Sequence, residues 1–255
     1  MADRSPISTV LRWTFAPLLL VAASYAVDWV LRAENVPVRN VRFEGPFKRV
    51  TQAELEGAVL DLLRGNFFLV DLDAVQRRVE DLPWVRRAAV HRRFPQDIAV
   101  HFTEQRLAAR WGEDAWVNTN GEVVQVSGDD LPGALPRLDG PQGTAAEVLA
   151  AYAQFRERLA ALELELVGLA LSARRHWELE VKTAAGGRRF TLVADHERPL
   201  PRLERFAQVY TATLARRSAG IERVDLRYTN GFAVQWGRGT NRAQAAGALG
   251  GRNEG

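Results

Sequence analysis

The sequence contains no cysteine, which excludes disulfide bonds, thiolate nucleophiles and cysteine-ligated metal sites. Lysine is nearly absent as well, because Lys48 and Lys182 are the only two lysines among 34 basic residues. The chain has four histidines: His91, His101, His176 and His196. None of the four lies in a metal-ligand spacing such as HExxH, so we expect no metal site.

Catalytic motifs are missing too. No serine stands in a GxSxG elbow, and no glycine-rich loop has the pattern that cradles a phosphate. Acidic pairs such as Glu163 with Glu165, or Glu178 with Glu180, fall on the polar faces of periodic segments. We therefore expect a protein that is not an enzyme and that has neither a cofactor nor a small-molecule substrate.

Composition is that of a folded chain with a modest positive charge. The 255 residues are 47% hydrophobic and 25% charged, with a net charge of +3, which suits one or two globular domains. The densest basic patch is Arg86, Arg87, Arg92 and Arg93. Because neither an aromatic platform nor a recognition helix accompanies this patch, we expect a strand edge or a protein contact there rather than nucleic-acid binding.

One long apolar run stands near the N-terminus, from Trp13 to Leu31, interrupted by Pro17 and Asp28 near its ends. Its length meets the roughly 20 residues that a bilayer-crossing helix needs, and a tryptophan lies near each end. The alternative is a cleaved signal peptide, for which Ser24-Tyr25-Ala26 resembles a cleavage site. Because the run exceeds a signal core, we expect an uncleaved transmembrane helix over 13–31 with a short cytoplasmic tail, 1–12, and the large domain outside.

Residues 38–106 show the pattern of a small domain. A strand is predicted over Val38–Phe43, and Thr51 with Glu54 forms a capping box that opens a helix ending at Gly65. A second helix is predicted from Leu72 to Leu82, where Pro83 stops it. Two alternating strands follow around the turn Phe94–Asp97. The order strand, helix, helix, strand, strand is that of a POTRA module, in which both helices cover one face of a three-stranded sheet.

Residues 107–237 predict an α+β domain built on an antiparallel sheet. Asn120-Gly121 indicates one hairpin, and a helix is predicted over 145–164 with Phe155 and Leu159 on its apolar side. Pro199 begins a last helix, which Gly220 follows. A final hairpin is predicted from Val224 to Trp236, turning at Asn230-Gly231. Residues 238–255 have no periodicity, and we expect them to be disordered.

The final hairpin is the candidate binding site. If its second strand is the last in the sheet, its free backbone edge could accept a strand from a partner. Tyrosine, tryptophan and arginine dominate interface hot spots, so Arg227, Tyr228 and Trp236 are the predicted contacts, whereas their apolar neighbours pack the core.

Four stretches carry a family resemblance: NFFLVDL at 66–72, LPWVRRAAVHRRFP at 82–95, LPRLDGP at 135–141 and VDLRYTNGFAVQW at 224–236. Together with the order of the parts, they resemble the bacterial cell-division family FtsQ/DivIB over about residues 10–237. The resemblance implies a non-enzymatic divisome scaffold in the inner membrane at the septum, single-pass, with a cytoplasmic N-terminus and a periplasmic C-terminal domain.

The resemblance also implies partners and sites. The family recruits FtsB and FtsL, binding FtsB through the last strand and the turn before it, which correspond here to Arg227, Tyr228, Asn230 and Trp236. The POTRA module is associated with localisation through other divisome proteins, for which the candidate surface is Val90, His91, Arg92, Arg93 and Phe94. The alternative is a POTRA-containing component of outer-membrane protein assembly or secretion, which would need repeated POTRA modules or a β-barrel.

Overall fold

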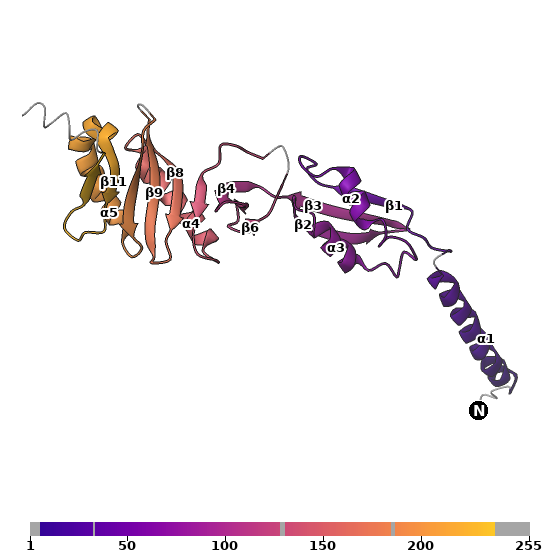
Figure 1. The fold of residues 1–255 in the computed structure, drawn as a ribbon. Coiled ribbons are helices and arrows are strands. Elements are labelled where there is room, and N and C mark those ends of the chain that lie inside the picture. Colours follow the sequence, from indigo (N-terminus) through magenta and orange to yellow (C-terminus); the bar gives the residue numbers. More distant parts are fainter. Residues whose placement is uncertain (1–5, 33, 128–130, 185–186, 238–255) are drawn as a thin grey trace, which may run out of the picture. The chain divides into compact units, whose positions relative to one another are not determined.

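The computed structural model describes residues 6–32, 34–127, 131–184 and 187–237. The predicted disordered tail, 238–255, lies outside these residues, as do the first five residues of the predicted cytoplasmic tail. The chain divides into two compact units between Gln105 and Arg106. Figure 1 shows the ribbon of both units.

The first helix, α1 (Pro6–Leu31), is longer than predicted, because it begins within residues 1–12, the predicted cytoplasmic tail. Its side chains are described from Pro17 onward. Leu18, Leu19 and Leu20 are 65–71% exposed, and Asp28 forms an ion pair with Arg32 one turn later at 2.5 Å. Within the described residues, none of the helices combines the length and the apolar character that a bilayer crossing requires, so the predicted crossing is not confirmed.

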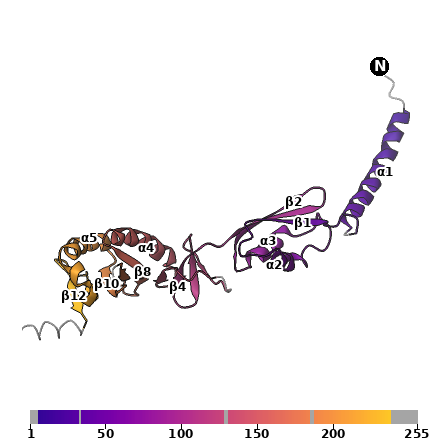
Figure 2. The same ribbon diagram turned by 90° about the horizontal axis from the view of Figure 1, so that it is seen from above.

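The rest of the first unit is a three-stranded sheet with two helices. The strands are β1 (Asn40–Glu44), β2 (Val85–Arg93) and β3 (Asp97–Glu104), and the helices are α2 (Gln52–Val59) and α3 (Leu72–Glu80). The sheet order is β1-β3-β2, with β1 parallel and β2 antiparallel to the central β3. Figure 2 shows both helices on the same side of the strands. The predicted order of elements is therefore confirmed.

Local chemistry explains where these elements begin and end. The predicted capping box is present, because the Glu54 amide donates to the Thr51 hydroxyl and the Glu54 carboxylate accepts from the Thr51 amide. The Asp71 carboxylate caps α3 by accepting from the Ala74 amide at 3.0 Å. At the end of β3, one oxygen of Glu104 accepts the backbone N–H groups of three successive residues, 48–50, at 2.8–3.0 Å. This carboxylate thus ties the last residue of β3 to the loop before α2.

The second unit is a nine-stranded sheet with the order β12-β11-β10-β9-β8-β7-β4-β5-β6. Its strands are β4 (Leu107–Trp111), β5 (Ala115–Asn118), β6 (Val123–Val124), β7 (Arg137–Asp139), β8 (Leu164–Leu171), β9 (His176–Thr183), β10 (Arg189–Asp195), β11 (Ile221–Asp225) and β12 (Ala233–Trp236). Its helices are α4 (Ala145–Ala160) and α5 (Pro199–Val209), and α5 continues through a π-turn (Tyr210–Leu214) and a 3₁₀ turn (Ala215–Gly220).

Both helices lie over one face of this sheet, as Figure 2 shows. The core between helices and sheet is apolar and closed, with Phe155, Leu159, Leu179, Leu192 and Phe206 all at most 2% exposed. The opposite face is polar, and cross-strand ion pairs run along it: Lys182–Glu165, Arg189–Glu180 and Arg223–Glu178. A sheet with one face packed and one face in solvent explains the alternation of polar and apolar residues in β9.

The prediction of an antiparallel sheet is wrong in part. Three neighbouring pairs are parallel: β4 with β7, β7 with β8, and β10 with β11. The last two pairs are joined by α4 and α5, and a helix is long enough to bring the chain back for a parallel strand. The two helices predicted from the sequence therefore also set the direction of the strands that follow them.

The final hairpin also differs from the prediction. The first strand ends at Asp225 rather than continuing through Tyr228, and a loop of residues 226–232 replaces the expected two-residue turn. The cause is local, because the Asp225 carboxylate accepts the backbone N–H of Arg227 at 3.0 Å. Such an Asx turn redirects the backbone and ends a strand.

Candidate partner-binding surface

Strand β12 forms one end of the nine-stranded sheet. It pairs with β11 on its inner side, in antiparallel register with Val224 opposite Val234 and Asp225 opposite Ala233. On its outer side it has no strand partner among the residues that the structure describes. An edge of four residues with free backbone groups is a template on which another chain can add a strand.

Loop 226–232 stands beside this edge, and its first turn is fixed by charge. The Arg227 guanidinium forms an ion pair with Asp225, with Nε 2.9 Å from Oδ1 and Nη2 2.6 Å from Oδ2. These side-chain hydrogen bonds are the main reason why the pKa of Asp225 lies below its usual range and the pKa of Arg227 lies above its own. The ion pair therefore persists at neutral pH.

Two arginines of α5 donate hydrogen bonds to backbone carbonyl oxygens of the loop. Arg202 donates to the carbonyl oxygens of Leu226, at 3.1 Å, and Arg227, and its guanidinium also pairs with Asp195. Arg205 donates to the carbonyl oxygen of Thr229 at 2.7 Å. Because the loop carbonyls are bound in this way, the backbone of the loop is ordered before any partner arrives.

The predicted contact residues separate into two groups. Arg227, Tyr228 and Asn230 lie in the loop and are exposed, Tyr228 to 59%. Trp236 lies in β12, is only half-buried and packs against the core together with Val234. Tyr228 is therefore accessible to a partner, whereas Trp236 packs against the core of its own domain.

The second predicted surface, Val90–Phe94, divides in a similar way. His91 is exposed and stacks on His101 at 4.7 Å, Arg93 is exposed, and Phe94 is 73% exposed. Val90 packs against the core, and Arg92 turns inward to bind backbone carbonyls of residues 67, 68 and 70. The arginine-rich stretch is thus not one continuous basic face.

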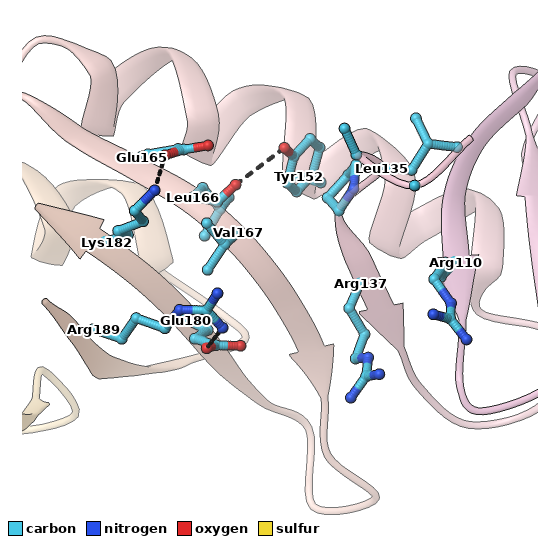
Figure 3. Close-up of a pocket in the computed structure, with 13 residues that line it drawn as sticks. Arg110, Leu135, Arg137, Tyr152, Glu165, Leu166, Val167, Glu180, Lys182 and Arg189 are labelled. Carbon is cyan, nitrogen blue, oxygen red and sulfur yellow. Dashed lines mark hydrogen bonds and ion pairs between the residues drawn. The ribbon is translucent and has the colours of Figure 1, made fainter. Parts of the chain in front are cut away.

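A pocket of about 490 Å³ is lined by residues of β8, β9 and α4 and of the segment before β7, and Figure 3 shows this lining. The Tyr152 hydroxyl donates to the carbonyl of Leu166 at 3.1 Å, and burial raises the pKa of this hydroxyl, so it stays protonated. Arg189 pairs with Glu180 at 2.9 Å. The Tyr152 hydroxyl and the Arg189 guanidinium thus each bind a neighbouring group of the domain. Such pairing is typical of side chains that stabilise the fold rather than of a catalytic pair.

A metal site would need several histidine or acidic side chains close together. Within the part of the chain that the structure describes, no group of three or more histidine or acidic side chains lies close enough to hold a metal ion. Beside the stacked His91 and His101, Glu44 lies 3.2 Å from His101.

Sequence reasoning missed the residues that support the loop. Arg202 and Arg205 are separated from their loop partners by about two dozen residues, and arginines are frequent throughout the chain. The only signal was their spacing of three, which places two residues on one face of a helix.

Comparison with known proteins agrees with this architecture. Residues 36–105 match the model of the FtsQ-type POTRA domain, and residues 109–227 match that of the C-terminal region of the cell division protein FtsQ/DivIB. The chain belongs to the FtsQ/DivIB family of cell division proteins. The matched region ends at Arg227, so Tyr228, Asn230 and Trp236 lie just beyond it.

Curated relatives share most of the chain. A cell division protein FtsQ of Shewanella oneidensis is 37% identical over 210 residues, which cover 82% of this chain and 78% of the relative. The FtsQ of Xanthomonas campestris is 36% identical, and the match covers 89% of this chain and 80% of the relative. The FtsQ of Burkholderia pseudomallei is 33% identical, and the match covers 87% of this chain and 88% of the relative. These FtsQ relatives favour cell division over the alternative function in outer-membrane protein assembly.

Proposed function

We propose that this chain is a scaffold of the division machinery that binds the periplasmic parts of FtsB and FtsL through β12 and loop 226–232. The observation that carries the proposal is the combination of a free edge strand with an ordered loop that exposes Tyr228. A partner strand would gain main-chain hydrogen bonds from β12, and Tyr228 would supply a side-chain anchor. The proposal needs no catalytic group.

The proposal includes a membrane anchor. In α1, apolar side chains from Leu18 to Val27 are exposed, and a helix with such a surface needs an apolar environment. The ion pair between Asp28 and Arg32 lowers the cost of placing the aspartate near a headgroup layer. We propose that α1 spans the inner membrane with its N-terminus in the cytoplasm and that the two units lie in the periplasm at the septum.

The first unit has a separate role in the proposal. His91 and Arg93 are the exposed polar members of the Val90–Phe94 surface, and they are the candidate contacts with other divisome proteins that bring the chain to the septum. Septal fluorescence of a tagged chain carrying His91→Ala and Arg93→Ala tests this role. Unchanged septal localisation would remove this surface from the proposal.

The main experiment measures binding of the full chain, in lipid nanodiscs, to a complex of FtsB and FtsL. We expect Tyr228→Ala to weaken binding by about 2 kcal/mol, roughly thirtyfold, because exposed aromatic anchors carry a large share of interface energy. The matched control is Val123→Ala, which truncates a side chain that is 50% exposed at the other end of the same sheet. We expect this control to bind like the parent.

Two results would contradict the proposal in different ways. No binding by the parent chain would remove FtsB and FtsL as partners. Equal binding by the parent and Tyr228→Ala, with circular dichroism unchanged, would place the partner surface elsewhere on the chain.

A further inference from the structure

Three exposed apolar side chains gather at one end of the first sheet. Phe68 is 42%, Leu69 63% and Phe94 73% exposed, and we call these three residues the aromatic patch. The rings of Phe68 and Phe94 lie 6.3 Å apart between centroids, although they come from separate segments of the chain. Both rings also contact Phe67, which is fully buried, at 5.2 and 5.6 Å. The patch is therefore a continuation of the core to the surface.

The backbone beneath the patch is held by polar side chains. Arg92 donates to the carbonyl oxygens of Phe67, Phe68 and Val70 at 2.7–3.1 Å. The side-chain oxygen of Asn66 accepts the backbone N–H of Phe68 at 2.8 Å. Backbone groups that are satisfied within the protein can leave water without a desolvation penalty, which is the condition for entering a lipid environment.

The same asparagine joins the patch to α1. Asn66 is 3% exposed, and its amide nitrogen donates to the carbonyl oxygens of Val30, at 2.6 Å, and Arg32, at 3.1 Å. The next amide, that of Phe67, donates to the carbonyl of Val36 at 2.8 Å. Phe68 is only two residues from Asn66, a backbone distance of at most about 7 Å, and Asn66 itself contacts the last turn of α1 through its side chain.

This connection keeps the patch close to a membrane interface at the end of α1. The polar layer on each side of the hydrocarbon is roughly 5–8 Å thick, and apolar side chains of surface-bound segments enter it to about 5–10 Å. Trp29, which is 50% exposed near the end of α1, is a residue type that prefers this layer. If α1 ends at the hydrocarbon boundary, the aromatic patch lies in the headgroup layer.

Charge at the rim of the patch suits the same environment. Arg64 is exposed next to the segment that carries Phe68 and Leu69, and it has no ion pair with a described residue. Cations at this position attract anionic headgroups. A protein partner would be an alternative occupant, but the direct connection to the end of α1 favours the bilayer.

We propose that Phe68, Leu69 and Phe94 insert into the headgroup layer of the leaflet at which α1 ends and hold the POTRA unit against the membrane. This inference rests on the proposed role of α1 as a membrane anchor. It assigns a second, peripheral lipid contact to a domain that the family comparison describes only as a POTRA domain.

The absence of cysteine makes the test direct, because one introduced cysteine gives one labelled site in the full chain. Phe94→Cys, and separately Leu69→Cys, are labelled with an environment-sensitive fluorophore in nanodiscs containing phosphatidylglycerol. We expect blue-shifted emission and a loss of intensity when nitroxide is placed on lipid headgroups. Both side chains are largely exposed, so the substitutions do not open the core.

The matched control is Phe47→Cys. Phe47 is 40% exposed but follows the opposite end of β1, where its ring packs on Phe102 at 5.0 Å. We expect its label to show neither the blue shift nor the quenching. Quenching of the Phe94 and Leu69 labels no greater than that of the Phe47 label would overturn the proposal.

A label at Val21→Cys in α1 separates this inference from the proposed anchor. Quenching of that label by nitroxide on the acyl chains, without headgroup quenching at Phe94 and Leu69, would leave the anchor intact and refute the lipid contact of the patch. Failure at Val21 itself would refute the anchor, and the inference with it.

Discussion

The two ends of the nine-stranded sheet differ in how they meet solvent. At one end, β6 has only two residues, and its turn is closed by the buried Asn118, whose side-chain oxygen accepts the N–H groups of Asn120 and Glu122. Gly121 in that turn lies so close to α4 that an added Cβ would be 2.7 Å from Ala146. At the other end, β12 has four residues and stands beside a loop that exposes an aromatic side chain.

The comparison of β6 with β12 shows that an edge strand is not by itself a binding site. Short edge strands with tightly packed turns are a common protection against unwanted pairing, and β6 has both features. The β12 edge lacks this protection, and α5 supports the loop beside it with two arginines.

The largest effect is expected for Phe206→Ala. Phe206 is fully buried in α5 and its ring contacts that of Phe232, just before β12, at 5.7 Å. Removing a buried phenylalanine costs about 3–5 kcal/mol of unfolding free energy. Guanidinium denaturation of the full chain in detergent, monitored by circular dichroism, measures this loss. The control is Val117→Ala in β5, next to β6, which truncates a smaller buried side chain. A cost under about 1 kcal/mol would show that this ring does not support the β12 end.

A smaller loss is expected for Trp236→Ala. Trp236 lies opposite Ile221 in the pairing of β11 and β12 and is half-buried against the core. We expect stability to fall by about 1.5 kcal/mol, because part of a large apolar surface returns to water. Denaturation and partner binding are measured on the same variant. Weaker binding with unchanged stability would instead make Trp236 a direct partner contact.

The ion pair between Asp225 and Arg227 predicts a dependence on pH. Because the folded-state pKa of Asp225 is depressed, the stability it contributes is present above the unfolded aspartate pKa, about 3.9, and is lost as pH falls through the lower folded value. Arg227 is partly exposed, so Asp225→Asn should cost no more than about 1 kcal/mol at pH 7. Urea denaturation at several pH values checks this; a difference from the parent that grows on acidification would contradict it.

The most local effect is expected for Arg205→Ala. Its guanidinium makes one hydrogen bond to the loop, to the carbonyl of Thr229, so the cost is about 0.5–1.5 kcal/mol and concentrated locally. We expect faster hydrogen exchange of the amides in loop 226–232 with little change in global unfolding. Arg158→Ala, on α4, removes an ion pair with Glu204 away from the loop and serves as control. Unchanged exchange in the loop would show that Arg205 does not order it.

Local signals in the sequence predicted much of the fold. The capping box at Thr51 and Glu54 and the alternation in β9 depend on neighbours in the chain, so both could be recognised without a structure. In contrast, β7 has three residues and no periodicity, and it exists because it fits between β8 and β4. Pairing of that kind depends on the assembled sheet.

The candidate site was predicted in outline only. The binding hypothesis required the last strand to lie at an edge of its sheet, and the structure places it there among the described residues. The alternation of Val224, Leu226 and Tyr228 predicted a longer strand, but the Asp225 carboxylate turns the backbone first. The support from Arg202 and Arg205 could not be predicted, because it joins residues that only tertiary packing brings together.

The parallel pairing of β1 with β3 has a mechanical consequence. The chain enters β1 at its N-terminal end, coming from α1, and leaves β3 at its C-terminal end toward the second unit. Tension between a membrane anchor and a partner-bound second unit would pull these adjacent strands in opposite directions along their length. Hydrogen bonds from Asn40–Asp97 to Glu44–His101 would then bear the load together, in shear, rather than opening one by one. If the proposed anchor and partner contacts hold, the pairing of β1 with β3 would resist such a pull along its whole length.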